Sequence, residues 1–155
     1  MPLMEATDLL WRPAVQRDIN VMLFGKRLDN GATREVFEWQ MHERKYVIKI
    51  EDGDHFHNIM EHITWNAVRN TEYAKWFAPV YRVTPGGHAL IMRRTREARA
   101  GDPEFPEIPD FFVDVRYRNW GIMDGRWVCH DYAYHNIMSS GLKNIQMVQV
   151  KPETW

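Results

Sequence analysis

The chain has 155 residues, of which 45% are hydrophobic, and its 20 Lys and Arg residues balance 21 Asp and Glu residues. This composition predicts one soluble globular domain with a real core, and it excludes the basic excess typical of nucleic-acid binding. The single cysteine, Cys129, excludes a disulfide framework and a Cys-rich zinc site. No apolar run approaches the roughly 18 residues of a membrane span, so we expect a cytoplasmic protein that does not enter a membrane.

The N-terminal part of the chain is expected to form a short helix followed by strands. Residues 4–11 have the pattern of a helix that Pro13 ends, and we expect residues 1–20 to lie as a strap over the domain without a chemical role. From Val21 the pattern favours three consecutive antiparallel strands. The third of them, residues 45–50, is rich in β-branched side chains.

Lys49 lies near the end of this third predicted strand, in an otherwise apolar run. An unpaired buried ammonium costs several kcal/mol, so the side chain should face either solvent or a buried anion. In the first case Lys49 is the lysine of an edge strand, where its charge prevents pairing with another chain. In the second case a buried anion must lie close to it, and a carboxylate is one such anion.

A helix is predicted after the polar residues 51–57, because apolar side chains then recur at helical spacing. Glu61 lies on a neighbouring face of this helix, from which it could point back toward Lys49. Glu72 is the second candidate for that carboxylate, and a surface position for Glu61 is the alternative. The residues expected on the apolar face are Phe56, Ile59, Ile63 and Ala67.

Three histidines before and within this helix could form part of a zinc-binding site. His55, His57 and His62 lie close in sequence to Asp54. No fourth ligand follows at a recognisable spacing, and loop histidines are usually solvated. We therefore favour solvated histidines over a zinc site.

Two further strands are predicted at residues 79–83 and 88–92, joined by the turn sequence Thr84-Pro85-Gly86-Gly87. They complete a sheet of five strands with one helix. Residues 96–110 carry three prolines and several charges, so we expect an extended connection there.

The segment from Asp114 to Asp131 contains a strong hairpin signal. Asp124-Gly125 lies between two short apolar runs, and such a pair suits a tight turn in which both central residues have positive φ. The hairpin would bring Asn119 and Asp131 together at its open end, with Asp114 one short loop away. Amide and carboxylate oxygens are ligands that Mg²⁺ accepts when it also binds waters and phosphate oxygens. The alternative is that Asp114 caps a turn and Asp131 is an ordinary strand-end carboxylate.

The order of these residues resembles the protein-kinase-like fold. The family's HRDxxxxN pattern is similar to the run from Phe112 to Asn119, with Phe-Val in place of His-Arg, and its DFG pattern is similar to Asp131-Tyr132-Ala133. The family's V-A-I-K strand is similar to Tyr46-Val47-Ile48-Lys49. Of the three glycines in the family's nucleotide loop only one has a counterpart, and the other two positions hold Asp29 and Arg34.

This resemblance implies roles in catalysis and metal binding. Asp114 would orient or deprotonate an acceptor hydroxyl, and Arg116 would stand where the catalytic loop often carries a lysine. Asn119 and Asp131 would hold Mg²⁺.

The resemblance also implies a nucleotide site. Gly31 and Val36 would belong to the loop that covers the phosphates of ATP, and Lys49 would bind the α- and β-phosphates while paired with Glu61. Met92 would precede a hinge, residues 93–95, whose backbone meets the adenine.

We therefore expect an α+β protein with a single kinase-like domain over residues 1–155. Residues 21–92 would form the small lobe, a five-stranded antiparallel sheet plus one helix, and residues 93–110 the hinge and linker. Residues 111–155 would form the catalytic loop, metal hairpin and tail of a strongly reduced large lobe, without the helices that dock a peptide substrate. Compact chains of this kind are expected from a phage or a mobile element.

Two functions follow. The first is a phosphotransferase that binds Mg²⁺–ATP and acts on an acceptor that the sequence does not identify. The second is a catalytically inactive kinase-like protein that binds and modulates a host or regulatory protein. The four retained residues Lys49, Asp114, Asn119 and Asp131 favour the first. The incomplete glycine loop and the 7 Trp and 9 Met residues, if they form an exposed face and not a core, favour the second.

Overall fold

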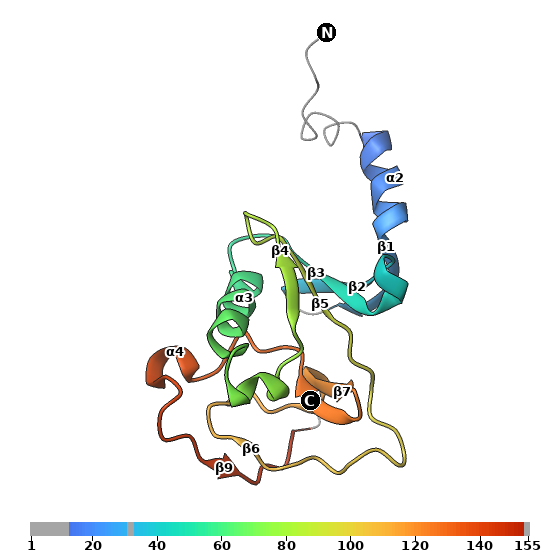
Figure 1. The fold of residues 1–155 in the computed structure, drawn as a ribbon. Coiled ribbons are helices and arrows are strands. Elements are labelled where there is room, and N and C mark those ends of the chain that lie inside the picture. The colour runs from blue at the N-terminus through green and yellow to red at the C-terminus, as the bar shows by residue number, and fades with distance from the viewer. Residues whose placement is uncertain (1–12, 31–32, 154–155) are drawn as a thin grey trace.

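The computed structural model describes residues 13–30 and 33–153, which form a mixed α+β fold (Figure 1). Its main feature is a five-stranded antiparallel sheet in the order β1-β2-β3-β5-β4, which confirms the predicted sheet. The strands are β1 (Phe24–Asn30), β2 (Arg34–Trp39), β3 (Tyr46–Glu51), β4 (Val80–Val83) and β5 (Ala89–Arg93). The β-branched run of β3 thus forms the central strand.

The start of the sheet differs from the prediction. Residues 21–23 are not strand but belong to α2 (Pro13–Leu23). Pro13 begins this helix because its fixed φ and missing N–H suit a first helical position. No residue of α2 is fully buried, but Gln16 and Ile19 line a cavity together with Ile50 and Ile91 of the sheet, so this helix borders the outer face of the sheet at the β1 end (Figure 1). The helix predicted for residues 4–11 lies outside the described residues.

The two faces of the sheet carry different side chains. Residues directly opposite each other in an antiparallel pair share a face, so the register of Val36 with Lys49, and of Lys49 with Leu90, puts these side chains on one face. This inner face contacts α3 (His57–Val68) and the C-terminal half of the chain. Ile50 and Ile91 lie on the outer face and line an apolar cavity of about 270 Å³ beside α2.

Helix α3 exists as predicted, but the prediction of its buried face was wrong. Phe56 and Ile63 are exposed, at 55% and 38%, although both belong to the predicted apolar face. The buried positions of the helix are Asn58, Glu61, Thr64 and Val68. Charged side chains on the inner face of the sheet require polar partners, and Asn58 and Glu61 supply them, whereas Val68 packs in the apolar core.

The N-terminus of α3 is fixed by β3. Both carboxylate oxygens of Glu51 accept hydrogen bonds from the helix, one from the backbone N–H of His57 and one from that of Asn58, at 3.0 and 3.0 Å. These N–H groups have no partner within a helix, and a carboxylate there also interacts favourably with the helix dipole. Strand and helix are therefore joined directly.

The C-terminal half contains short elements on the inner side of the sheet. The predicted hairpin is present, and both Asp124 and Gly125 in its turn have positive φ, 51° and 77°. Its strands are β7 (Trp120–Met123) and β8 (Arg126–Cys129). The other elements of this half are β6 (Ile108–Pro109), α4 (Ile137–Ser140), β9 (Met147–Val148) and the 3₁₀ turn Tyr117–Asn119, and two further 3₁₀ turns, His42–Arg44 and Glu72–Trp76, come earlier in the chain. In the described residues no helix is long and apolar enough to cross a membrane.

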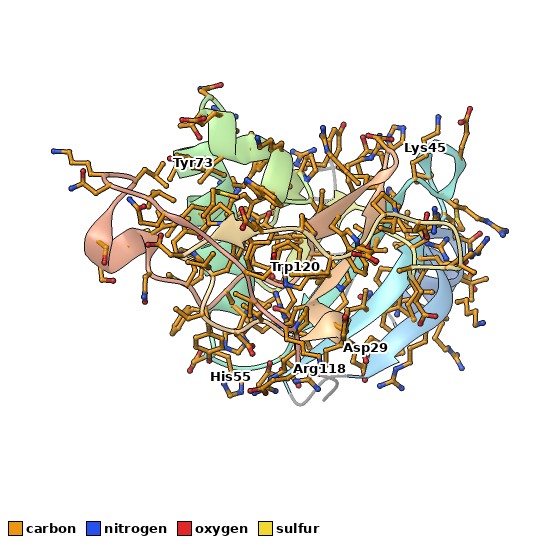
Figure 2. The ribbon with its side chains drawn as sticks, turned by 90° about the horizontal axis from the view of Figure 1, so that it is seen from below. Asp29, Lys45, His55, Tyr73, Arg118 and Trp120 are labelled. Atoms are coloured by element: carbon orange, nitrogen blue, oxygen red, sulfur yellow. The ribbon has the colours of Figure 1, made fainter. Side chains whose placement is uncertain are left out.

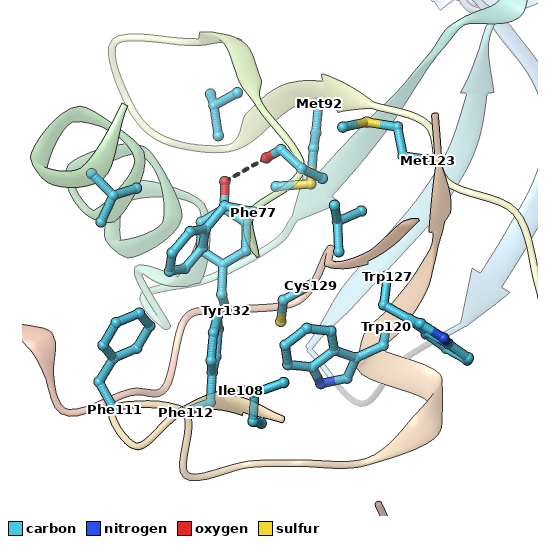
Figure 3. Packing of buried hydrophobic residues seen from close by; sticks show 14 of the residues in the cluster. Phe77, Met92, Ile108, Phe111, Phe112, Trp120, Met123, Trp127, Cys129 and Tyr132 are labelled. Carbon is cyan, nitrogen blue, oxygen red and sulfur yellow. Dashed lines mark hydrogen bonds between the residues drawn. The ribbon is translucent and has the colours of Figure 1, made fainter. Parts of the chain in front are cut away.

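An aromatic core holds the hairpin against the sheet (Figure 3). The ring of Phe77 lies between those of Phe112 and Tyr132, with centroids 5.1 and 4.9 Å away. The Tyr132 hydroxyl donates a hydrogen bond of 2.8 Å to the carbonyl of Ala78. Viewed from below, Trp120 lies in the middle of the molecule, whereas charged residues such as Lys45 lie at its margin (Figure 2).

Candidate functional site

The site is centred on a buried ion pair between strand β3 and helix α3. Lys49 Nζ lies 3.0 and 2.9 Å from the two carboxylate oxygens of Glu61, and the residues are 4% and 0% exposed. The predicted pairing is therefore present, and the edge-strand alternative for Lys49 is wrong because β3 is central and Lys49 points inward. Burial lowers the pKa of Lys49, as does the charge of Arg34, although Glu61 opposes both.

Arg34 is the second cation of the site, and the sequence analysis assigned it no role. Its Nη1 lies 2.9 Å from Glu61 Oε2, and its Nη2 lies 3.1 Å from Glu61 Oε1 and 2.6 Å from Asp131 Oδ1. Burial would lower the pKa of this guanidinium, but Glu61 and Asp131 raise it above its usual value. Its position two residues before Val36 was the available signal, because i and i+2 in a strand share a face and Val36 lies opposite Lys49.

Asp131 joins this group from the end of strand β8. Burial would raise the pKa of its carboxyl group, but the charges of Lys49 and Arg34 outweigh that effect and hold the pKa below its ordinary value. The backbone around Asp131 is fixed as well: Lys49 Nζ donates to the His130 carbonyl, and Tyr132 N–H donates to Glu61 Oε1 at 3.1 Å. Two cations and two carboxylates thus meet between the sheet, α3 and the hairpin.

The predicted catalytic loop lies beside this charged group. The Asn119 side-chain amide donates to the Asp114 carbonyl at 3.0 Å and to Asp114 Oδ2 at 3.1 Å. The other oxygen of that carboxylate, Oδ1, lies 2.9 Å from Arg116 Nε. At the open end of the hairpin, the Asn119 carbonyl accepts hydrogen bonds from the backbone N–H groups of His130 and Asp131, at 2.8 and 3.3 Å. The hairpin therefore makes Asn119 and Asp131 neighbours, as predicted.

The other residues predicted to bind the nucleotide do not all lie at this site. Val36 is half-buried on the inner face opposite Lys49. Met92 is wholly buried in the core, in register with Val47 and Val80 on the neighbouring strands. Gly31 lies outside the described residues. Glu72, the second candidate for the partner of Lys49, is exposed in the 3₁₀ turn 72–76.

The end of the predicted hinge, Thr95, and the first residue of the predicted linker, Arg96, pack directly on the hairpin. Arg96 exchanges two backbone hydrogen bonds with Ile122, of 3.0 and 2.8 Å. A Cβ atom at Gly121 would lie only 2.5 Å from Thr95 Oγ1, so nothing larger than glycine fits between the two segments. A planar base could enter here only if residues 95–96 separated from β7.

His130 strengthens this contact. Its Nε2 lies 2.7 Å from the Arg118 carbonyl and must donate a proton to it, so its Nδ1 accepts a hydrogen bond of 2.7 Å from the Thr95 hydroxyl. Burial lowers the pKa of His130, and the charge of Lys49 lowers it further, which is consistent with this neutral form of the ring.

A metal site depends on which side-chain oxygen, nitrogen and sulfur ligands lie close together. In residues 13–30 and 33–153, no group of three or more His, Cys, Asp or Glu side chains is placed to hold a metal ion. The His57 ring instead interacts with Thr33 Oγ1 and the Tyr134 hydroxyl, at 3.0 and 2.8 Å. The side-chain amide of the buried Asn119 is bonded to Asp114, and Asp131 is the exposed carboxylate beside it. An Mg²⁺ ion at these two residues would need most of its ligands from phosphate oxygens and water. The two residues do not fit a metal held by protein groups alone.

Comparison of the chain with models of known protein families and with curated protein sequences finds no match. The arrangement of Lys49, Glu61, Asp131, Asn119 and Asp114 is therefore the evidence from which a function can be proposed.

Proposed function

We propose that the protein is a kinase-like phosphotransferase that binds Mg²⁺–ATP between the inner face of the five-stranded sheet and the β7–β8 hairpin. The observation that carries the proposal is the buried Lys49–Glu61 ion pair with Asp131 beside it. The sheet with its single helix α3 would be the small lobe of a kinase-like fold, and the hairpin with its loops would be the reduced large lobe. The cytoplasm, where ATP is abundant, is the proposed location.

Energetics support a functional role for this group of charges. Burying charges in a protein costs free energy that their attraction only partly offsets, and apolar residues of similar volume often stabilise a fold more. The inner face nevertheless buries Arg34, Lys49 and Glu61 at 8%, 4% and 0% exposure. Groups with strongly perturbed ionisation cluster at functional sites, so this placement favours chemistry over stability alone.

Each residue has a role in the proposed reaction. Glu61 orients the Lys49 ammonium, which would bind the phosphates of the nucleotide. Asp131 and Asn119 would hold Mg²⁺, which when bound neutralises the negative charge of the phosphates. Asp114 would position the acceptor hydroxyl and accept its proton, and the contact of Arg116 Nε with Asp114 Oδ1 fixes the orientation of that carboxylate. Catalysis would come from positioning and charge neutralisation.

One observation favours a second candidate function. Thr95 and Arg96 fill the space beside Gly121 where the base would have to enter, and the charges of the site already balance one another. In a catalytically inactive kinase-like protein, these contacts would be permanent and a host or regulatory protein would be bound elsewhere on the surface.

Thermal unfolding with and without Mg²⁺–ATP tests the proposal. A ligand at 100 times its Kd stabilises a protein by about 2.7 kcal/mol, which corresponds to a Tm increase of roughly 5–10 °C for a chain of this size. We expect this increase in the wild type, a smaller one when EDTA replaces Mg²⁺, and none for Asp131→Asn. Lys49→Met should also weaken binding. No Tm increase at millimolar Mg²⁺–ATP would favour the second function.

Transfer of phosphate tests the chemical step separately. Incubation with ATP labelled at the γ-phosphate should release labelled phosphate to water or to an added acceptor at a rate above that of Asp114→Asn. Binding of Mg²⁺–ATP without any turnover above that variant would establish nucleotide binding alone and refute the phosphotransferase.

A further inference from the structure

We propose that Arg34 is a phosphate-binding residue of this site. In the nucleotide-free protein its guanidinium pairs with the Asp131 carboxylate, which binds the metal when nucleotide enters. This inference rests on the proposed function, because it concerns the same site. It assigns Arg34 a role as an exchangeable counter-cation, which binds Asp131 when the site holds no ligand and phosphate when metal and nucleotide enter together.

The geometry of the guanidinium carries the first half of the inference. Both Nη atoms contact Glu61, and Nη2 makes its shortest contact, 2.6 Å, with Asp131 Oδ1. Asp131 is also the more accessible of the two carboxylates, since its side chain is 46% exposed whereas that of Glu61 is 0% exposed. The Arg34–Asp131 contact is therefore the part of the network that a ligand from solvent can reach.

The charge balance carries the second half. Lys49 and Arg34 both contact Glu61, and Arg34 also neutralises Asp131. A divalent ion on Asp131 would place its two positive charges beside Arg34 and Lys49. The carboxylates nearby are those of Glu61, Asp131 and Glu51, and Glu51 already accepts hydrogen bonds from the start of α3. Phosphate groups supply the missing negative charge, so metal and phosphate should bind cooperatively.

The chemistry of arginine suits this exchange. Its planar guanidinium matches carboxylate and phosphate equally well through pairs of parallel N–H groups. Arg34 and Lys49 project from neighbouring strands onto the same inner face, so a phosphate beside Asp131 would have a cation on each side. The charge of Arg34 would thereby replace part of what backbone N–H groups supply in a glycine-rich loop.

Metal binding without nucleotide tests the exchange at Asp131. Mn²⁺ is the probe, and its free concentration is measured by electron paramagnetic resonance. We expect the wild type to bind Mn²⁺ weakly and Arg34→Gln to bind it about tenfold more tightly, because the carboxylate is no longer occupied. Arg27→Gln is the matched control: Arg27 lies 2.7 Å from Glu35 in a half-exposed ion pair on the same sheet, and the variant should behave as the wild type.

Arg34→Gln removes one of the two cations that contact the buried Glu61, so its folding must be verified by circular dichroism. If it does not fold, Arg34→Lys replaces it, because a single ammonium retains the charge but cannot contact both carboxylates through a fork. Mn²⁺ affinity that is unchanged in the folded variant would overturn the exchange, whether or not the protein binds nucleotide.

Binding of inorganic tripolyphosphate with Mg²⁺, measured by calorimetry, tests the contact with phosphate. We expect Arg34→Gln to bind it about tenfold more weakly than the wild type and Arg27→Gln to bind it normally. If the wild type binds tripolyphosphate and Arg34→Gln binds it equally well, the phosphate role is refuted while the proposed function stands. If the wild type binds neither Mg²⁺–ATP nor tripolyphosphate, the proposed function and the phosphate role both fail, and the Mn²⁺ measurement still decides the exchange at Asp131.

Discussion

The two faces of the sheet differ in the charge that they bury. The inner face buries the charged residues Arg34, Lys49 and Glu51 beside apolar residues such as Leu90 and Met92. The outer face carries Ile48, which is buried, and Ile50 and Ile91, which are partly exposed beside an open apolar cavity. A sheet with only one covered face normally buries its apolar side and presents its polar side to water. The difference teaches that the covered face of this sheet is organised around charge, and the predictions below test how much stability depends on that organisation.

The largest effect is expected from removing the central carboxylate. Glu61→Gln leaves Lys49 and Arg34 with one carboxylate between them, and breaking a buried ion pair in this way typically costs about 3–5 kcal/mol. The control is Glu35→Gln, which removes a carboxylate from the outer face of the same sheet, where an exposed pair contributes about 0–1 kcal/mol. Urea unfolding measures both variants. Equal losses of stability would show that the two faces do not differ energetically.

A smaller effect is expected where residues 95–96 cover the hairpin. Gly121→Ala places a Cβ atom 2.5 Å from Thr95 Oγ1 and 2.9 Å from the Arg96 carbonyl, so the two segments must separate. Such overpacking costs about 1–3 kcal/mol. Denaturant unfolding should register the loss, and wild-type stability would mean that the contact is loose. If the nucleotide enters here, this variant should retain its affinity for Mg²⁺–ATP in spite of the lower stability.

Tyr132→Phe should have a still smaller effect. The substitution removes only the hydroxyl that donates to the Ala78 carbonyl and leaves the aromatic packing against Phe77 intact. We expect a loss of about 1 kcal/mol in thermal or chemical unfolding. A loss above about 3 kcal/mol would mean that this hydrogen bond anchors the segment after Asp131 more strongly than its single contact indicates.

The smallest effect is a dependence of stability on pH through His135. Its Nδ1 accepts a hydrogen bond from Ile137 N–H, and its Nε2 lies 2.6 Å from Thr64 Oγ1, whose own hydroxyl donates to the Met60 carbonyl. The ring is thus neutral with its proton on Nε2, and burial lowers its pKa from the ordinary value of 6.5.

Because the unfolded chain then binds the proton more tightly than the folded one, the contribution of His135 is present above pH 6.5 and is lost as the pH falls below it. Urea unfolding at pH 7 and pH 5.5 should show this loss in the wild type and less of it in His135→Gln. The exposed His55 provides the control, and a pH dependence that follows His55→Gln instead would exclude His135 as the source.

Much of the fold was predictable because its signals are local. The β-branched residues of β3, the Asp124-Gly125 turn and the spacing from Lys49 to Glu61 each depend on a few neighbouring residues. The buried face of α3 was predicted wrongly because apolar periodicity ranks Phe56 and Ile63 above the polar residues that the sheet requires.

The role of Arg34 could not be predicted from local patterns. Its partner Asp131 lies 97 residues further along the chain, and the contact arises only once the hairpin has packed beneath the sheet. The pairing of Arg96 with Ile122 is likewise set by tertiary structure, since neither segment has a strand pattern that selects the other.

The double attachment of α3 to β3 has a mechanical consequence. Glu51 holds the first turn of the helix, and Lys49, two residues earlier on the same strand face, holds Glu61 one turn further along. Two anchors separated along the axis prevent the helix from rotating as well as from sliding, so strand and helix must move as a single rigid body. The contacts that cross from this body to the C-terminal half include those of Lys49 with His130, of Glu61 with Tyr132 and of Thr64 with His135. An opening of the molecule at this seam would have to break them together with the apolar core that the two parts share.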